Sequence, residues 1–357
     1  MGKLTPKERV LRVMRKQEPD KTPFTIYQTQ INTQCFVERN LRNRGMCILH
    51  WQTASYRIFY KGVDVKNVSW ITEDGTEYLK TLYSTPYGDM YTLKQRSGIT
   101  KDFTYWTLEH MFKGPEDYKK IHYMITNAVV IQELDAYKRL TEEFGDDVLL
   151  RDSIMAEPLQ NLISREFMDP ETFSYEWYDN RDEILKLEAA FKELNRKIYN
   201  ILAESPSEII QYGYNATPEI IGPKVFEEYY LPNYYEAAEI LHKKNKIMGT
   251  HLDSNNASIM HLIEKSALDY VESYDPLISP SVEVAMRELK SKVICINWPS
   301  GWHLNPLEEV PELTKQLIQQ ADPTRFVIGI SENVPPDRKY KVFSGIMDGI
   351  DQYWGIK

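Results

Sequence analysis

The chain has 357 residues, of which 42 % are hydrophobic, 27 % charged and 12 % aromatic, which is typical of folded globular proteins and excludes disordered and fibrous classes. Its 43 basic and 52 acidic residues leave a formal charge of -9, and the basic residues are scattered, so we expect no nucleic-acid partner. A membrane-spanning helix needs about 20 consecutive apolar residues, and no stretch approaches that length. Residues 1–21 also lack the apolar core of a signal peptide. We therefore expect a cytoplasmic protein with no membrane partner. Its three cysteines show no CxxC spacing, so we expect them to be reduced.

The first third of the chain predicts a helix and an antiparallel β segment. Residues 4–17 form the expected helix, with Thr5 as N-cap and Pro6 at its first position, and a short apolar run follows at 23–27. Between about 67 and 95, short β-like pieces are separated by turn sequences at 73–76 and 85–89. We therefore expect an N-terminal helical and β-hairpin extension within residues 1–125.

From about residue 146 onward, apolar strands alternate with amphipathic helices. One helix carries an apolar stripe from Ile184 to Ile201, the next opens at Gly222-Pro223 with a kink expected at Pro232, and a third begins at Pro306. The expected strands are 148–154, 208–214, 246–253, 270–274, 292–297 and 325–331. With one or two earlier strands they approach eight, which predicts an α/β fold of the (β/α)8 TIM-barrel type in one domain, residues 1–357. A doubly wound open sheet is the alternative, although no GxGxxG turn supports it.

The ends of the predicted strands are where a parallel α/β fold collects reactive residues. His251 and Asp253 are two positions apart on a strand, so both side chains project to one side and can hold a metal ion, and Glu332 at another strand end can supply a third ligand. A structural His–Asp pair and an exposed loop glutamate are the alternatives. Glu157 follows a further strand end and is a candidate fourth ligand, although a surface position is the more ordinary expectation.

Aromatic residues lie at or just beyond three of these strand ends. Tyr212, Tyr214, Trp298 and Trp302 can line a pocket that accepts an aromatic substrate, with core packing as the alternative for the tyrosines. The sequence has no GxSxG, GxxxxGK[ST] or HExxH motif.

Several segments together resemble the uroporphyrinogen decarboxylase superfamily, and within it the cobalamin-dependent methyltransferase branch. Residues 251–255 are similar to an HxDGN variant of that superfamily's metal motif, and residues 212–215 to its substrate-side strand, which implies that Asn215 also binds substrate. The other matching segments are the opening at 4–10 and 18–23, the TPxG turn at 85–88, the SPxxFEEYxxP helix at 222–232 and the closing strand end at 332–336.

Two departures from the family pattern narrow the implied activity. Residues 24–30 read FTIYQTQ and lack the arginine-rich segment with which true decarboxylases hold a porphyrinogen, which disfavours a tetrapyrrole substrate. Asp253 and Glu332 stand where members of the coenzyme-M type have cysteines, and Ser254 replaces a glycine. Exchange of thiolates for carboxylates makes a bound ion a harder Lewis acid that prefers oxygen.

The resemblance therefore implies the methyltransferase I of an O-demethylase. We expect His251 and Asp253 to be catalytic, and His251, Asp253 and Glu332 to bind a divalent metal, with zinc expected. The metal would polarise the oxygen of a methyl ether, expected to be aryl, while cob(I)alamin on a partner corrinoid protein takes the methyl group. The alternatives are a decarboxylase or lyase that uses His251 and Asp253 as acid and base, and a catalytically inert subunit of a corrinoid complex. The sequence leaves open the methyl donor, the metal, its fourth ligand, the corrinoid partner and the oligomeric state.

Overall fold

The computed structural model of the chain describes residues 4–33, 35–50, 55–96, 105–163, 166–216 and 218–356. They divide into two compact units. The first consists of Met1–Ser55, Glu133–Ile154 and Asn200–Lys357, and the second of Tyr56–Gln132 and Met155–Tyr199. The expected extension, residues 1–125, is thus divided between both units, because the residues up to Ser55 belong to the first.

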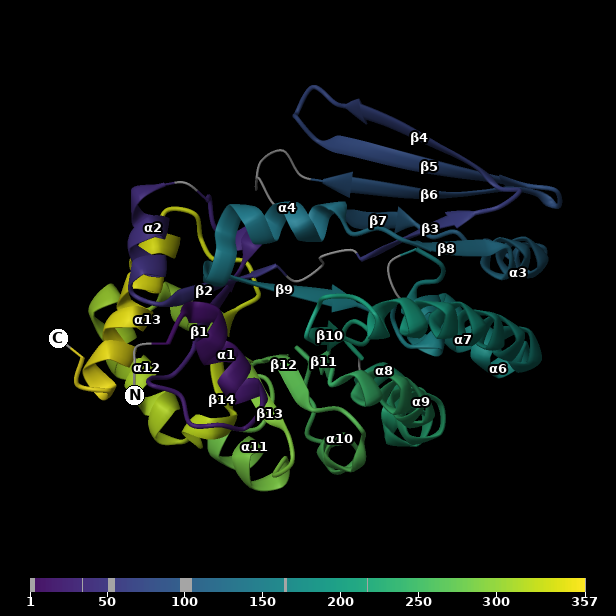
Figure 1. Ribbon diagram of the computed structural model, residues 1–357. Coiled ribbons are helices and arrows are strands. Elements are labelled where there is room, and N and C mark those ends of the chain that lie inside the picture. The colour runs from purple at the N-terminus through teal and green to yellow at the C-terminus, as the bar shows by residue number, and fades with distance from the viewer. Residues whose placement is uncertain are drawn as a thin grey trace. The chain divides into compact units, whose positions relative to one another are not determined.

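The first unit contains a closed barrel of eight parallel strands, which confirms the expected (β/α)8 class (Figure 1). Around the barrel the strands follow the order β1-β14-β13-β12-β11-β10-β9-β2. Their bounds are β1 (Phe24–Tyr27), β2 (Met46–His50), β9 (Val148–Ser153), β10 (Ile209–Gln211), β11 (Ile247–His251), β12 (Tyr270–Tyr274), β13 (Val293–Asn297) and β14 (Phe326–Ile330). All six strands expected after residue 146 are present, and β1 and β2 complete the barrel.

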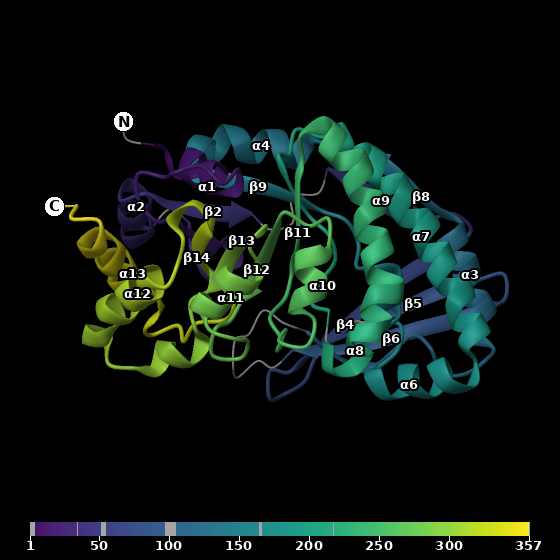
Figure 2. The same ribbon diagram turned by 90° about the horizontal axis from the view of Figure 1, so that it is seen from below.

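Helices alternate with these strands, and Figure 2 shows α11 to α13 outside strands β12 to β14. The helices of the first unit are α1 (Pro6–Met14), α2 (Phe36–Asn43), α4 (Asp135–Phe144), α8 (Pro218–Val225), α9 (Leu231–Leu241), α10 (Met260–Lys265), α11 (Val282–Glu288), α12 (Val310–Gln319) and α13 (Lys339–Tyr353). Among the described residues, no helix has both the length and the apolar character needed to cross a bilayer.

Helix α1 closes the end of the barrel at which the strands begin. The Thr5 side chain accepts a hydrogen bond from the backbone of Glu8, whose side chain accepts one from the backbone of Thr5, so a capping box fixes the helix start. The apolar face of α1 shares one buried core with the first residues of four strands, Ile209, Ile247, Tyr270 and Val293. The end of the barrel at which the strands finish is therefore the one available for a site.

Two local features differ from the simplest reading of the sequence. Strand β10 ends at Gln211, because Gly213 follows with a positive φ of 77° that turns the chain, so Tyr212 and Tyr214 lie beyond the strand. The expected irregularity at Pro232 takes the form of a π-helical turn, Phe226–Tyr230, directly before α9. Since proline lacks an N–H, it cannot continue the ladder of hydrogen bonds from the preceding turn.

The second unit contains the expected antiparallel β segment. Its four-stranded sheet has the order β4-β5-β6-β7, and a separate pair joins β3 to β8. The bounds are β3 (Tyr56–Tyr60), β4 (Asp64–Ile71), β5 (Glu77–Thr85), β6 (Gly88–Arg96), β7 (Trp106–Glu109) and β8 (Ala128–Gln132), with helices α3 (Asp117–Thr126), α5 (Pro158–Ile163), α6 (Pro170–Asp179) and most of α7 (Arg181–Ala203).

Candidate functional site

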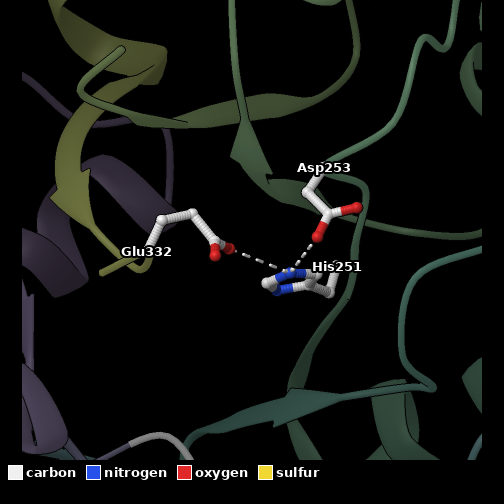
Figure 3. Close-up of side chains that lie close together, drawn as sticks. All are labelled: His251, Asp253 and Glu332. Carbon is white, nitrogen blue, oxygen red and sulfur yellow. Dashed lines mark ion pairs between the residues drawn. The ribbon is translucent and has the colours of Figure 1, made fainter. Parts of the chain in front are cut away.

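Three polar side chains meet where β11 and β14 end. His251 is the last residue of β11, Asp253 follows it, and Glu332 follows β14 (Figure 3). The Nε2 atom of His251 lies 3.4 Å from Asp253 Oδ2 and 3.9 Å from Glu332 Oε1. One ligand atom from each residue lies within 4.8 Å of the others, an arrangement that can hold a metal ion.

The other ring nitrogen of His251 faces a buried carboxylate. His251 Nδ1 lies 3.2 Å from Oε1 of Glu272, which points into the barrel from β12. Ligating histidines commonly use their second nitrogen in this way, because the carboxylate fixes the ring orientation and leaves Nε2 with a lone pair for the metal. Glu272 therefore orients His251 toward Asp253 and Glu332.

Glu272 is itself held by two further residues inside the barrel. Arg151, from β9, forms an ion pair with Glu272, and the hydroxyl of Tyr27 donates a hydrogen bond to the same carboxylate. Arg151 is 1 % exposed and Glu272 4 % exposed. A buried ion pair of this kind is stable only when its remaining polar atoms are also satisfied, and Tyr27 and His251 supply those partners.

The charges of this layer shift the pKa values of its members. Burial alone would raise the pKa of Glu272, but Arg151 and His251 lower it to about 2. Burial alone would lower the pKa of His251, but the carboxylates of Asp253 and Glu272 raise it to about 9. Burial raises the pKa of Glu332. Without a metal ion, His251 is therefore positively charged and lies among the three acids Asp253, Glu272 and Glu332. A metal ion at this position would replace the proton of His251.

The loop that carries Glu332 is fixed by two side chains from neighbouring strands. Asn297 Oδ1, at the end of β13, accepts hydrogen bonds from the backbone and hydroxyl of Ser331. Ser273 lies at a β-bulge in β12 with a positive φ of 57°, and its hydroxyl donates to Glu332 over 3.3 Å and contacts Ser331 over 2.6 Å. Bulges commonly redirect a side chain beside an active site, and this one directs Ser273 to Glu332.

Asn215 and Tyr214, two of the expected substrate-binding residues, lie beside this group in the loop after β10. The amide of Asn215 donates to the hydroxyl of Ser254 over 2.9 Å, so it braces the loop that carries Asp253. Both Tyr214 and Asn215 are partly exposed. Their expected contact with substrate stays a prediction.

Two of the expected aromatic residues lie in the core. Tyr212 has no exposed surface and packs edge-on against Tyr234 of α9, with ring centroids 5.3 Å apart. Trp298 is equally buried and donates its indole N–H to the hydroxyl of Thr314 on α12. Both side chains face helices outside the barrel. Tyr212 is therefore a core residue, as the alternative expected, and Trp298 is a core residue too.

Trp302 and Glu157 complete the candidates from the sequence. Trp302 is partly exposed and packs edge-on against Trp298, so it is the tryptophan of that loop that a ligand could reach. Glu157 is fully buried, which corrects the expectation of a surface position. Its role as a fourth ligand stays a prediction.

Comparisons with known proteins agree with this architecture. A methyltransferase from Methanosarcina mazei superimposes on 98 % of this chain and 99 % of its own with a TM-score of 0.61, and at 12 % identity the likeness shows the fold. A structure of the pneumococcal virulence factor StrH covers 96 % of this chain and 85 % of its own at 10 % identity, with a TM-score of 0.41 that is too low to support an argument. No curated protein matches the chain. The family model of uroporphyrinogen decarboxylase (URO-D) matches residues 107–353, more than two thirds of the sequence, and the chain therefore belongs to the URO-D family.

Proposed function

We propose that this protein is a methyltransferase that cleaves a methyl ether, most simply an aryl one, and passes the methyl group to cob(I)alamin on a separate corrinoid protein. The observation that carries the proposal is the convergence of His251 Nε2 with the carboxylates of Asp253 and Glu332, while Glu272 holds Nδ1. Membership of the URO-D family and the likeness in fold to a methyltransferase support the same reading.

The donor set fits a divalent metal ion such as zinc. One imidazole and two carboxylates are ordinary zinc ligands, and the pairing of His251 with Glu272 is the outer contact that ligating histidines commonly have. With two oxygen donors and no thiolate, the set would make a bound ion a harder Lewis acid, which suits an oxygen-containing substrate. When bound, the metal would supply Lewis acidity that polarises the ether oxygen.

The protein's own residues would position the ether and keep the site open to it. The side chains of Asp253 and Glu332 are 35 % and 43 % exposed, so the group is accessible at the end of the barrel where the strands finish. Of the four aromatic residues expected to line a pocket, Tyr214 and Trp302 are the two that are partly exposed, so an aryl ring could reach them. The ether C–O bond breaks with its electron pair left on oxygen, and the new bond to cobalt uses the electron pair that cob(I)alamin brings.

A second candidate function is supported by the electrostatics of His251. Because Asp253 and Glu272 raise its pKa to about 9, the metal-free imidazole is protonated at neutral pH and can donate a proton to a substrate. A decarboxylase or lyase that works without metal would use it in this way.

Absorbance spectroscopy of cobalamin tests the proposal. The purified protein, loaded with zinc, is mixed with cob(I)alamin and methoxylated aromatic compounds, and methylcobalamin formation is followed. We expect His251→Ala to reduce the rate by more than about 100-fold, since changes to outer contacts of a metal site alone cost about 10–100-fold. His261→Ala, which changes an exposed histidine of α10, is the matched control and should leave the rate unchanged.

Two results would count against the proposal. No methylcobalamin from any methoxylated compound, with either free cobalamin or corrinoid proteins as acceptor, would contradict it. An undiminished rate in His251→Ala would contradict the role of the site. Proton-dependent release of carbon dioxide from a carboxylic acid by the metal-free protein would instead establish the second candidate.

A further inference from the structure

Strand β4 forms an unusually open edge of the sheet in the second unit. It lies at one end of the order β4-β5-β6-β7 and pairs with β5 alone among the described strands (Figure 1). The pairing runs through all eight residues of β4 without a bulge. Every one of these eight residues is exposed. The strand therefore presents a straight row of backbone N–H and C=O groups on the side away from β5.

The opposite edge of the same sheet is protected from pairing with another chain, and β4 is not. Strand β7 has four residues and its pairing with β6 is interrupted by a bulge between Leu93 and Lys94. Short length and bulges are two of the devices by which proteins prevent an edge from pairing with another chain. Strand β4 has neither, and it contains no proline and a single lysine, Lys66.

Apolar side chains occupy both faces of β4. Val68 and Trp70 lie on one face, where they are 46 % and 41 % exposed, and Trp70 stacks on Tyr78 of β5 with ring centroids 5.2 Å apart. Val65 and Ile71 lie on the other face and are 45 % and 70 % exposed. An exposed apolar strand with a free edge is the usual signature of a surface that pairs with another strand.

We propose that β4 pairs antiparallel with β4 of a second copy of this chain, around a two-fold axis that passes midway between the two Val68 residues. The two four-stranded sheets then become one sheet of eight strands, with equivalent faces on the same side. A two-fold axis makes the contact self-complementary, so each pair of different residues occurs twice. In this register Val68 lies opposite its own copy, and the other opposed pairs are Lys66 with Trp70, Val65 with Ile71, and Asn67 with Ser69.

The chemistry of these pairs favours a second copy of β4 in this register. Val68 and the Val65–Ile71 pairs join apolar side chains, Lys66 lies opposite the ring of Trp70, and Asn67 and Ser69 are both polar. The two neighbouring symmetric registers match unlike groups. The one around Asn67 places Asp64 opposite Trp70 and Lys66 opposite Val68, and the one around Ser69 places Asn67 opposite Ile71. Residues that lie directly opposite each other in an antiparallel pair have side chains on the same face of the sheet. Their residue numbers in β4 must therefore differ by an even number, so no register lies between these symmetric ones.

Sedimentation of the full-length protein over a range of concentrations tests the proposal. The wild type should be a dimer, and Val68→Lys, which sets two lysines opposite one another, should raise the dissociation constant by at least about tenfold. Leu304→Lys places the same charge at another apolar residue, 70 % exposed in the first unit, and should leave the dimer unchanged. A monomeric wild type, or a dimer that Val68→Lys does not weaken, would overturn the proposal.

Mixing two variants tests the register. Val68→Asp should also dissociate alone, whereas an equal mixture with Val68→Lys should form heterodimers, because Lys and Asp then lie opposite each other at the axis. Circular dichroism identical to the wild type checks that both variants are folded, as expected for an exposed position. Failure of the mixture to associate would exclude pairing through Val68. The test uses no substrate, metal or corrinoid, so its outcome is independent of the proposed methyl transfer.

Discussion

The two units of this protein treat their polar and apolar groups in opposite ways. The barrel holds charge in its interior, where Arg151 and Glu272 pair at 1 % and 4 % exposure, while the antiparallel sheet leaves apolar Val68 and Trp70 partly open to solvent along β4. Parallel strands of a barrel are covered on both sides, so any charge among them has to be paired. An edge strand has no such cover, and its side chains gain burial only from a partner.

This difference indicates where each unit is sensitive to change. In the barrel, Glu272 links Arg151 to His251, so the stability of the interior and the geometry of the site depend on the same carboxylate. In the sheet, exposed residues of β4 contribute little to the folded chain itself. We therefore expect large stability effects in the barrel interior and small ones along β4.

The largest effect is expected at Glu272. Glu272→Gln keeps the shape of the side chain but leaves the buried guanidinium of Arg151 without its counter-charge, which should lower the free energy of unfolding by about 3–5 kcal/mol. Urea denaturation of the metal-free protein measures the loss. Glu332→Gln, at a side chain that is 43 % exposed, is the control and should change stability by less than about 1 kcal/mol. Equal losses in both variants would show that Glu272 is not the carboxylate that stabilises the interior.

A somewhat smaller effect is expected where the barrel has no space for a methyl group. A Cβ atom at Gly249, on β11, would lie 2.4 Å from the ring of Tyr270, so Gly249→Ala should cost about 1–3 kcal/mol through overpacking. Gly301→Ala is the matched change, since its Cβ would meet Leu277 at an ordinary 3.6 Å. The account predicts no loss of stability in the control, and an unaltered Gly249→Ala variant would contradict the tight interior.

On β4, replacement of a large aromatic residue should have little effect on the folded chain. Trp70 is 41 % exposed and contacts Tyr78 across the sheet, so Trp70→Ala should cost about 0.2–1 kcal/mol in dilute solution. Tyr234→Ala, at a fully buried aromatic of the barrel unit, should cost about 3–5 kcal/mol in the same urea titration. Comparable costs for the two changes would erase the contrast between the units.

The smallest effect is a pH dependence on the surface of the barrel unit. The hydrogen bond that His242 donates to the carboxylate of Asp269 raises the pKa of His242 above its usual 6.5. Because the folded state then holds the proton more tightly than the unfolded chain, this stabilisation is complete below about pH 6.5 and disappears as the pH rises through the raised pKa. His242→Asn should therefore destabilise the protein more in mildly acidic than in alkaline buffer. The pH dependence should vanish when Asp269→Asn is also present, and its persistence there would assign it to another group.

Much of the fold could be predicted because its signals are local. The alternation of apolar strands and amphipathic helices located all six strands after residue 146, and the cap at Thr5 located the first helix. The group of His251, Asp253 and Glu332 could be found because all three lie at or just beyond strand ends on the same side of a barrel.

The residue that holds His251 from inside the barrel could not be predicted in the same way. Glu272 lies inside the strand Tyr270–Tyr274, and only the register of β12 against β11 brings it to His251. A charged residue in the middle of a predicted buried strand was the available signal. The alternation of side chains along a strand could also have predicted that Tyr212 is a core residue. Tyr212 directly follows Gln211, the last residue of β10, so its side chain projects to the opposite side, toward α9.

Elemental analysis of the purified protein shows whether His251, Asp253 and Glu332 hold a metal ion. Zinc and other divalent metals are counted per chain in the wild type, in His251→Ala and in His261→Ala. We expect about one equivalent in the wild type and in His261→Ala, and loss of that metal in His251→Ala. Absence of metal from the wild type even after reconstitution, or a full equivalent retained in His251→Ala, would contradict this expectation.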